Sequence, residues 1–456
     1  MYALKAVSRI RSGWHVNIAT LLLAVAAYLF VLQPNPANAM KIETVKSPGG
    51  IEAWLVRSSS VPLLSMRFAF DGGSSQDPKG REGVANFLTA MMDEGAGDLD
   101  AGAFQERQET LAMRMSYDDG RDHFYGNFST LTKNRAESVK LLKLAITKPR
   151  FDETAIERMR KQLLSSLVSA ARSPNKVVAK AWYKAAFGDH VYGRPSSGTL
   201  ETIKAITRQD LLDYHRRIFA KSNLKVAVVG DIDADALGKL LDDVFGDLPE
   251  TAELSEVPKI SVPTGGAQKV IEMNVPQSVA MFGLGAMSRK DPDFMPGFVL
   301  NHIVGSGGFS SKLMEEVREK RGLAYSVYTY INPLAKSSIL IGSVATKNEA
   351  MGKSLEVIRA ELQKMADKGP SDKDLQDAKQ YLIGSYALRF DTSNKIANQM
   401  LGVMIEDIGI DYFEKRNSLI EAVTVEDLKR VAKTLLDTNN LIVLVVGKPD
   451  GVKNSG

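Results

Sequence analysis

Few residues in this sequence could bind a metal ion or act as nucleophiles. The chain contains no cysteine, which excludes disulfides, thiolate metal ligands and a cysteine nucleophile. His15 lies in an N-terminal apolar segment, and the remaining histidines show no pair at the i, i+4 spacing that places two imidazoles on one helix face. His123, His190, His215 and His302 are therefore expected to be surface residues or hydrogen-bonded core residues.

The segment GSGGFSSKLMEEVREKRGLAYSVYTY carries two side chains that could act on a polarised carbonyl group. Ser310 or Ser311 can cap a helix, Gly322 can end it, and LAYSVYTYI is typical of a strand. This pattern places Arg318 in the last turns of the helix and Tyr325 near the start of the strand.

The chemistry of this pair follows from its functional groups. A peptide carbonyl attacked by water develops negative charge, which a fixed phenol O–H and a guanidinium can stabilise in a water-poor cleft. The structural alternative is that Arg318 complements the helix dipole and that Tyr325 packs in a core. Because Lys320 and Arg321 already complement that dipole, Arg318 is less needed for it.

A glycine-rich loop of Gly305, Ser306, Gly307 and Gly308 precedes the predicted helix. It lacks the Lys and Ser/Thr of a phosphate-binding loop and the strand that precedes a dinucleotide site, so we exclude nucleotide binding. Glycines give backbone flexibility beside a cleft, as in a hinge or a substrate-binding loop. A purely structural role is equally compatible with the sequence.

The stretch GVANFLTAMM, Gly83 to Met92, is predicted to be a helix. Val84, Phe87, Leu88 and Met91 recur at helical spacing, which indicates burial on one side. Its remaining positions carry neither a histidine nor a carboxylate.

Residues 1–39 differ in composition from the rest of the chain. Lys5, Arg9 and Arg11 precede the apolar run IATLLLAVAAYLFVL, and PANA ends in an Ala-x-Ala site. We expect a secretory signal peptide cleaved after Ala39 and a periplasmic protein; an uncleaved membrane anchor is the alternative. Cleavage removes three basic residues and lowers the formal charge of the chain from +4 to +1. A nucleic-acid partner is therefore not indicated.

Three segments recur in the same order in the two halves of the chain. VPLLSMRFAFDGGSSQDP matches VPQSVAMFGLGAMSRKDP, and FDETAIERMRKQLLSSL matches PSDKDLQDAKQYLIGSY. TRQDLLDYHRRIFAKSNLKVAVVGDI, from Thr207, matches TVEDLKRVAKTLLDTNNLIVLVVGK, from Thr424; each is predicted to be a Thr-capped helix, a turn and a strand. The chain is therefore predicted to contain an internal duplication.

We predict an α+β fold of two similar domains, each a mostly antiparallel sheet with helices packed on it, which together enclose a cleft. The predicted boundaries are residues 1–39 for the signal peptide, 40–250 for the N-terminal domain, 251–264 for a linker rich in Pro, Ser and Glu, and 265–456 for the C-terminal domain.

In motif order, spacing and duplication, residues 41–448 resemble the pitrilysin or insulinase family of zinc peptidases, most closely the small bacterial members related to the mitochondrial processing peptidase. Active members carry His-x-x-Glu-His on the first-half helix, with two zinc-binding His and a general-base Glu, and a distal Glu completes the site. The corresponding residues of this chain are Asn86, Thr89, Ala90 and Ser166. Asn and Ser are poor zinc ligands, Ala is none, and Thr cannot replace the base, so no zinc is expected in this chain.

The resemblance also implies a role for Arg318 and Tyr325. In the family, an Arg and a Tyr at this spacing reach toward the scissile bond beside the zinc, and one subunit can carry the zinc motif while its partner carries this pair. The chain resembles the second kind: a subunit inactive alone, which pairs with a zinc-binding subunit as a heterodimeric endopeptidase for peptides or unfolded segments. A peptidase-like binding or scaffold protein is the alternative, and the lost ligands disfavour an enzyme active on its own.

Overall fold

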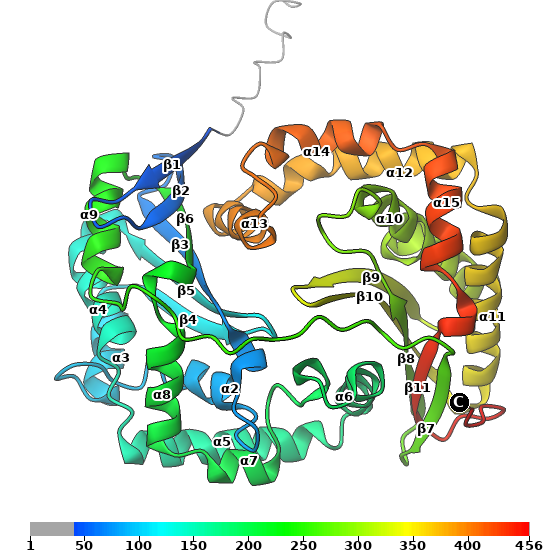
Figure 1. Ribbon diagram of the computed structural model, residues 1–456, viewed down its shortest axis with the longest axis horizontal. Coiled ribbons are helices and arrows are strands. Elements are labelled where there is room, and N and C mark those ends of the chain that lie inside the picture. The colour runs from blue at the N-terminus through cyan, green and yellow to red at the C-terminus, as the bar shows by residue number, and fades with distance from the viewer. Residues whose placement is uncertain (1–40, 456) are drawn as a thin grey trace, which may run out of the picture. The chain divides into compact units, whose positions relative to one another are not determined.

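The computed structural model describes residues 41–455, so the predicted signal peptide lies outside the described residues. From Ile42 onward the chain forms one compact unit, in which two sheets are each flanked by helices (Figure 1). Within residues 41–455, no helix is long and apolar enough to cross a membrane.

The first half contains a six-stranded sheet in the order β1-β2-β6-β3-β5-β4. Neighbouring strands are antiparallel, except that β2 and β6 are parallel. The strands are β1 Ile42–Lys46, β2 Glu52–Arg57, β3 Leu63–Asp71, β4 Arg114–Asp119, β5 His123–Leu131 and β6 Leu224–Gly230. The helices are α2 Val84–Thr89, α3 Ala101–Thr110, α4 Arg135–Thr147, α5 Glu153–Ala170, α6 Pro174–Phe187, α7 Leu200–Ala205, α8 Arg208–Ile218 and α9 Ala234–Phe245.

The second half contains a five-stranded sheet in the order β7-β11-β8-β10-β9, in which β7 and β11 are parallel. The strands are β7 Ala267–Glu272, β8 Gln277–Gly285, β9 Ser326–Leu334, β10 Ser337–Lys347 and β11 Ile442–Gly447. The helices are α10 Phe294–Asn301, α11 Asn348–Lys368, α12 Asp372–Gly384, α13 Ser393–Glu406, α14 Tyr412–Glu421 and α15 Val425–Leu435. Apart from β1, the two sheets have the same arrangement of strands, which confirms the predicted α+β fold and its duplication.

The helices that precede the last strand of each half begin in the same way. The Thr207 hydroxyl accepts a hydrogen bond from the Asp210 backbone N–H (3.2 Å), and the Thr424 hydroxyl accepts one from the Asp427 backbone N–H (3.1 Å). In both, the Asp side chain bonds back to the Thr, which completes a capping box. The predicted Thr caps are therefore confirmed.

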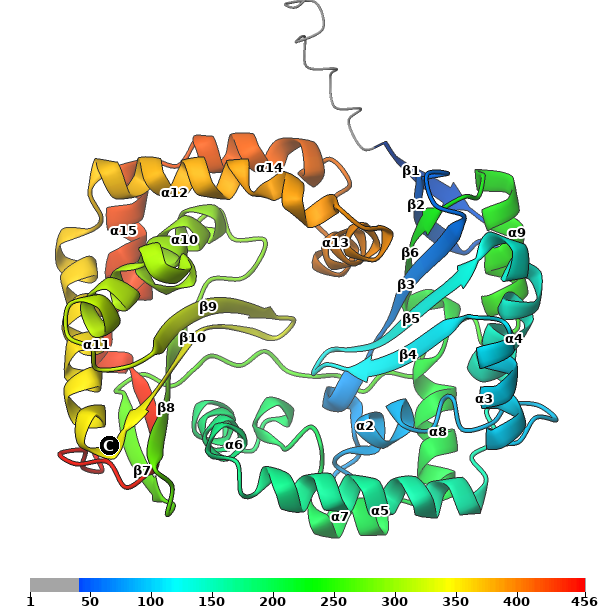
Figure 2. The same ribbon diagram turned by 180° about the vertical axis from the view of Figure 1, so that it is seen from behind.

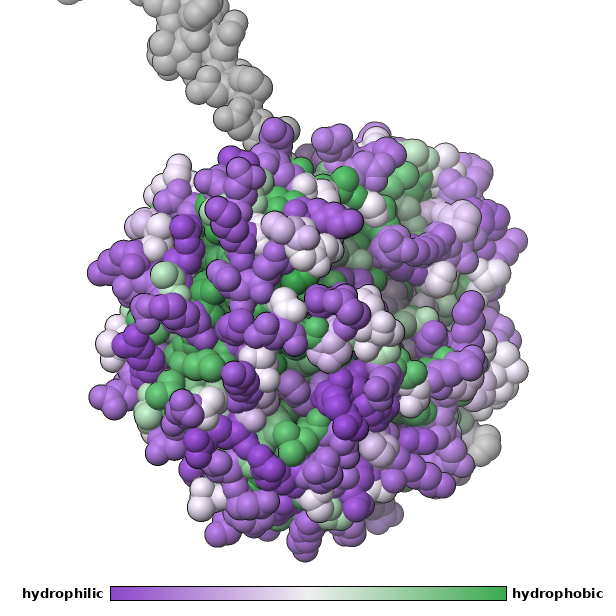
Figure 3. All heavy atoms as spheres, turned by 60° about the vertical axis from the view of Figure 1, so that its left-hand side comes forward, coloured by the Kyte–Doolittle hydropathy of each residue, from purple (hydrophilic) through white to green (hydrophobic). Residues whose placement is uncertain are grey.

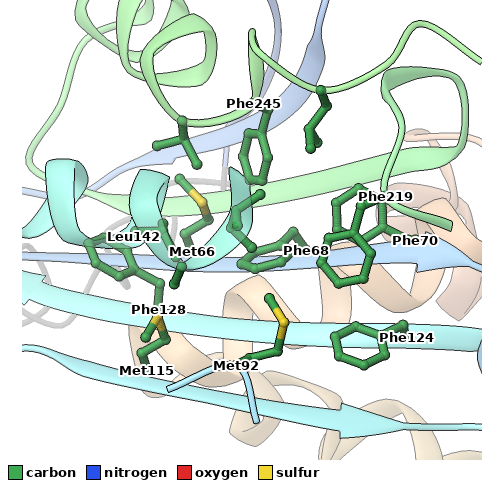
Figure 4. Close-up of a cluster of buried hydrophobic side chains, with 14 of the residues drawn as sticks. Met66, Phe68, Phe70, Met92, Met115, Phe124, Phe128, Leu142, Phe219 and Phe245 are labelled. Atoms are coloured by element: carbon green, nitrogen blue, oxygen red, sulfur yellow. The ribbon is translucent and has the colours of Figure 1, made fainter. Parts of the chain in front are cut away.

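The central strand β3 separates a core face from a polar face. Met66, Phe68 and Phe70 alternate along it and are fully buried, as expected for a strand with one face against helices. Figure 4 shows them packed with aromatic and methionine side chains from neighbouring elements. The intervening residues, which include Arg67 and Asp71, therefore point to the opposite face of the sheet.

On that opposite face, each sheet is covered by a helix from the other half of the chain. Helix α13 of the second half packs on β3 and β6 of the first, and α6 of the first half packs on β8 and β11 of the second (Figures 1 and 2). Trp182 of α6 is fully buried, and its Nε1–H donates to the Ile442 carbonyl (3.1 Å). The Ser65 hydroxyl of β3 donates to Oδ1 of Asn394 (2.6 Å). This exchange of helices ties the two halves together.

Candidate functional site

Helix α2 contains Asn86 and Thr89, two of the positions that the family resemblance assigns to the zinc motif. The Asp77 carboxylate holds its N-terminus by accepting hydrogen bonds from the backbone N–H groups of Gly83 (2.7 Å) and Ala85 (3.0 Å). Burial raises the pKa of Asp77 well above its ordinary value. The helix is shorter than the predicted Gly83 to Met92, because the N–H groups of Ala90 and Met91 bond three residues back, which tightens the chain into turns.

By the family resemblance, Asn86 corresponds to the first zinc-binding histidine. Its Nδ2 donates a hydrogen bond to Oδ1 of Asp119, at the end of edge strand β4 (2.8 Å). Burial raises the pKa of Asp119 to about 6, and the hydrogen bond from Asn86 partly opposes that rise. An amide–carboxylate pair thus stands where a metal ligand would be needed.

The other motif positions offer no zinc ligand either. The Thr89 hydroxyl donates to the Asn86 carbonyl (2.7 Å), Ala90 has no donor atom, and Ser166 is exposed on α5, which contacts α2. Across residues 41–455, no three His, Cys, Asp or Glu side chains are grouped so that they could hold a metal ion. The donor set does not fit catalytic zinc, which needs three protein ligands of the His or carboxylate kind.

The four histidines within residues 41–455 each contact other protein groups. His123 lies 3.3 Å from the Asp71 carboxylate, and a ring nitrogen of His190 bonds the Pro258 carbonyl. His215 is bonded to the Ile146 carbonyl, and burial lowers its pKa to about 4. His302 is buried and stacks on the Tyr381 ring. The positions of His123, His190 and His215 agree with the expected roles, whereas His302 is buried and its ring makes no hydrogen bond within residues 41–455.

The helix that carries Arg318 differs from the expected α-helix. After a first turn capped by Ser311, residues Met314–Glu319 form a π-helix, which ends before the left-handed Gly322 (φ 60°). π-Helical turns are rare and are often found at functional sites. The wider turn leaves Arg318 beside Tyr325, which directly precedes β9.

The structure brings Arg318 and Tyr325 into direct contact. Nη1 of Arg318 donates to the Tyr325 carbonyl (3.1 Å), and its Nε lies 3.3 Å from the Glu319 carboxylate. The guanidinium carbon lies 4.6 Å from the ring centroids of both Tyr325 and Phe309. Arg318 is thus sandwiched between two aromatic rings, a favourable cation–π arrangement.

The Tyr325 side chain is left free to interact outside the chain. Tyr325 is 80% exposed, and its hydroxyl makes no hydrogen bond to any residue in the described part of the protein. Phe309 is also exposed, at 67%. Phe309 was not predicted as a site residue, because nothing in the sequence distinguishes an exposed from a buried phenylalanine next to a glycine-rich loop.

Gly305 and Ser306 do not lie in the expected loop but in the last part of a π-helix, His302–Ser306. The glycines of this segment have different local requirements. A Cβ atom on Gly305 would lie 2.2 Å from Oγ1 of Thr329, so this glycine permits close packing against β9. Gly308 has a left-handed backbone (φ 60°) with open space around it. Gly305 thus has a structural role, while Gly308 shapes the exposed turn that presents Phe309.

A cavity of about 1380 Å³ lies between the two halves. The polar face of the first sheet, residues 332–336 of the second half and the C-terminal part of α13 line it. Of the residues that the structure describes, Arg318, Tyr325 and the glycine-rich loop are not part of this lining. Tyr325 is thus an exposed side chain that does not line this cavity.

The sequence of this chain is similar to proteins of one peptidase family. Residues 55–200 match the family described as Insulinase (Peptidase family M16), and residues 205–382 match the Peptidase M16 inactive domain. The chain is 25% identical over 431 residues to the non-peptidase homolog YmxG of Helicobacter pylori, covering 94% of this chain and 98% of that protein. It is 25% identical over 424 residues to an uncharacterized zinc protease of Mycobacterium tuberculosis strain H37Rv, covering 92% and 96%.

A solved structure shows the same architecture. The crystal structure of a peptidase M16 inactive domain from Pseudomonas fluorescens superposes with a TM-score of 0.84 at 26% identity, covering 91% of this chain and 99% of that one. The chain belongs to the insulinase family of peptidases, family M16. Within that family it is an inactive-type homologue.

Proposed function

We propose that this chain is the non-catalytic subunit of a heterodimeric zinc endopeptidase. It would supply Arg318 and Tyr325 to a site whose zinc, base and water belong to a homologous His-x-x-Glu-His subunit, for cleavage of peptides or unfolded segments. The observation that carries the proposal is the exposed, unbonded Tyr325 hydroxyl beside a guanidinium held between two rings. A phenol O–H and a guanidinium presented outward suit a carbonyl that another chain holds.

The surroundings of Arg318 support this role. Lys320 and Arg321 pair with the Glu316 carboxylate on the same helix, whereas Nη1 of Arg318 bonds the Tyr325 carbonyl. Because Arg318 fixes the backbone of Tyr325 and packs on its ring, it orients the phenol, and a positioned donor stabilises developing charge better than a mobile one.

The test is reconstitution with the zinc subunit, sought first as a similar-sized secreted protein encoded beside this one. Tyr325→Phe removes one O–H donor and should lower the turnover of the assembled complex by about 10- to 1,000-fold. Tyr328→Phe is the matched control, since Tyr328 is an exposed tyrosine of the adjoining strand and should leave turnover unchanged. Normal turnover of an assembled Tyr325→Phe complex would contradict the proposal.

Two observations favour a second candidate, a peptidase-like binding or scaffold protein. The Asn86–Asp119 hydrogen bond fills the former ligand position with a stable polar contact, and one relative is named a non-peptidase homolog. A scaffold does not require Tyr325 to act on substrate, so the reconstitution assay separates the two candidates.

We also propose that the protein is exported and that its mature form begins at Met40. The support is the sequence of residues 1–39, with its basic start, apolar run and Ala-x-Ala end. Intact-mass measurement of the protein from its native host tests this: a mass that includes residues 1–39 would indicate an anchored protein instead.

A further inference from the structure

Phe309 is an exposed phenylalanine whose ring has one defined contact. It lies on the turn Gly308–Ser310, which leads into the helix of Arg318. The guanidinium carbon of Arg318 lies 4.6 Å from its ring centroid, and within residues 41–455 no other cation or aromatic ring contacts it. Because the side chain is 67% exposed, it contributes little to the core of the second half. Its main interaction is therefore the one with Arg318.

Hydrogen bonds join the turn of Phe309 to the helix of Arg318. The Ser311 hydroxyl donates to the Gly308 carbonyl (2.8 Å) on one side of Phe309. The same hydroxyl accepts a hydrogen bond from the Met314 N–H (3.5 Å), at the start of the helix that carries Arg318. The turn and the helix are thus connected through one side chain, which keeps the Phe309 ring beside the guanidinium.

The Tyr325 ring depends on Arg318 for its position. The side chain is 80% exposed, and its hydroxyl has no hydrogen-bond partner among the residues that the structure describes. Among the same residues, the Arg318 guanidinium is the only cation or ring that lies against it, at 4.6 Å from the centroid. A change in the position of the guanidinium would therefore leave the phenol without a support.

The polar contacts of Arg318 hold only the edge of its guanidinium. Nη1 donates to the Tyr325 carbonyl (3.1 Å), and Nε lies 3.3 Å from the Glu319 carboxylate. The Glu319 side chain is 55% exposed, and an ion pair exposed to water is weak. The Phe309 and Tyr325 rings both lie against the guanidinium but do not contact each other, so they cover different parts of it. Phe309 therefore restricts the guanidinium where Tyr325 does not.

We infer that Phe309 is a positioning residue for the Arg/Tyr pair. Its ring keeps the Arg318 guanidinium against the Tyr325 ring, and through Arg318 it sets the direction of the Tyr325 hydroxyl. The inference rests on the proposed function, in which this hydroxyl acts on a carbonyl held by the zinc subunit, and it adds a third residue to that site. One exposed cation–π contact changes an equilibrium by about 2- to 5-fold, so its loss should lower the population of the correctly placed phenol by that factor.

The first experiment is NMR on the isolated chain with isotopically labelled arginine. The Nε–H signal of Arg318 is identified by its absence from Arg318→Lys. Protons above an aromatic face are shifted upfield, so this signal should lie upfield of the signals of exposed arginines and should move downfield in Phe309→Ala. Phe309→Tyr keeps a ring and should retain the shift, whereas Phe309→Leu keeps only apolar volume and should resemble Phe309→Ala. An Arg318 signal that is the same in Phe309→Ala and the wild type would overturn the inference.

The second experiment measures kcat and KM of the reconstituted complex with an internally quenched, unstructured peptide. Phe309→Ala should lower kcat by about 2- to 5-fold and change KM less, because Phe309 acts on the placement of the phenol and does not bind the substrate. Phe309→Tyr should restore kcat. Since Phe309 acts through Arg318, Phe309→Ala should have no further effect in an Arg318→Ala complex. A change confined to KM, or an undiminished effect in the Arg318→Ala complex, would contradict the positioning role.

Leu388→Ala is the matched control for both experiments. Leu388 is an apolar side chain of similar exposure, 71%, on the segment Tyr386–Phe390 of the second half. Its replacement should leave the Arg318 signal and kcat unchanged. Circular dichroism establishes that each variant is folded, and gel filtration establishes that each complex is assembled.

The NMR experiment does not involve the zinc subunit, so the two ideas can fail separately. An Arg318 signal that responds to Phe309→Ala, together with a fully active Tyr325→Phe complex, would refute the catalytic role of the Arg/Tyr pair and leave the contact between Phe309 and Arg318 standing. An unresponsive Arg318 signal, together with an impaired Tyr325→Phe complex, would refute the role of Phe309 and leave the proposed function standing.

Discussion

Replacing Asp119 by asparagine measures the electrostatic cost of burying the carboxylate that accepts a hydrogen bond from Asn86. Asp119 is partly buried, and its pKa rises from 3.8 to about 6, mainly through burial. At 1.36 kcal/mol for each unit of pKa, that rise corresponds to about 3 kcal/mol between the folded and unfolded chains. Asparagine has nearly the same shape, and its Oδ1 can still accept the hydrogen bond from Asn86.

The pH dependence has a definite sign. Because the folded-state pKa is raised, the folded chain holds the Asp119 proton more tightly than the unfolded chain does. This contribution to stability is fully present below pH 3.8 and is lost as the pH rises through about 6. Asp119→Asn should therefore match the wild type near pH 3.8 and exceed its free energy of unfolding by up to about 3 kcal/mol well above pH 6.

Urea unfolding followed by circular dichroism, at a series of pH values on either side of 6, measures this difference. The control is Asp243→Asn, an exposed carboxylate on α9, which should stay within about 0.5 kcal/mol of the wild type throughout. A difference between Asp119→Asn and the wild type that does not change with pH, or one that grows toward low pH, would refute the reasoning.

Three further results are expected. Elemental analysis of the dialysed, isolated chain should find no stoichiometric zinc. One equivalent of zinc would show that the chain has a zinc site outside the positions of the family motif. Trp182→Phe removes the hydrogen bond between α6 and β11. It should lower the free energy of unfolding by about 1–3 kcal/mol, measured by urea titration. An unchanged urea midpoint would mean that the packing of α6 on the second sheet does not depend on this hydrogen bond. Gly305→Ala should destabilise the fold by about 3 kcal/mol because its Cβ meets Thr329. Gly308→Ala should cost less, about 1–2 kcal/mol, from its left-handed backbone. A larger loss of stability for Gly308→Ala than for Gly305→Ala would show that Gly305 is not the glycine required for close packing.

The features that the sequence predicted correctly depend on neighbours along the chain. A capping box joins Thr207 to Asp210, three residues away, and the alternation of β3 assigns Met66, Phe68 and Phe70 to one face. The duplication was visible because both copies retained these local patterns. The replacement of the zinc ligands was likewise visible, since motif positions can be compared without coordinates.

The candidate site could be predicted only in part. The spacing of Arg318 and Tyr325 indicated a helix end followed by a strand, which is correct. The π-helical turn, the packing of the guanidinium between two rings and the contribution of Phe309 were not predictable. These details depend on how the turn packs against the rest of the second half, and the residue types involved fit several local geometries equally well.

Tertiary structure alone decided the contacts between residues far apart in sequence. It paired Asn86 with Asp119, packed α6 and α13 each on the sheet of the other half, and left the buried Nε of Arg67 without a hydrogen-bond partner among residues 41–455. The sequence by itself determined the family, the duplicated halves, the local caps and the loss of the zinc motif. Whether a buried charge is compensated depends on every group that folding brings near it, and that set is fixed only when the two halves close around the same cavity.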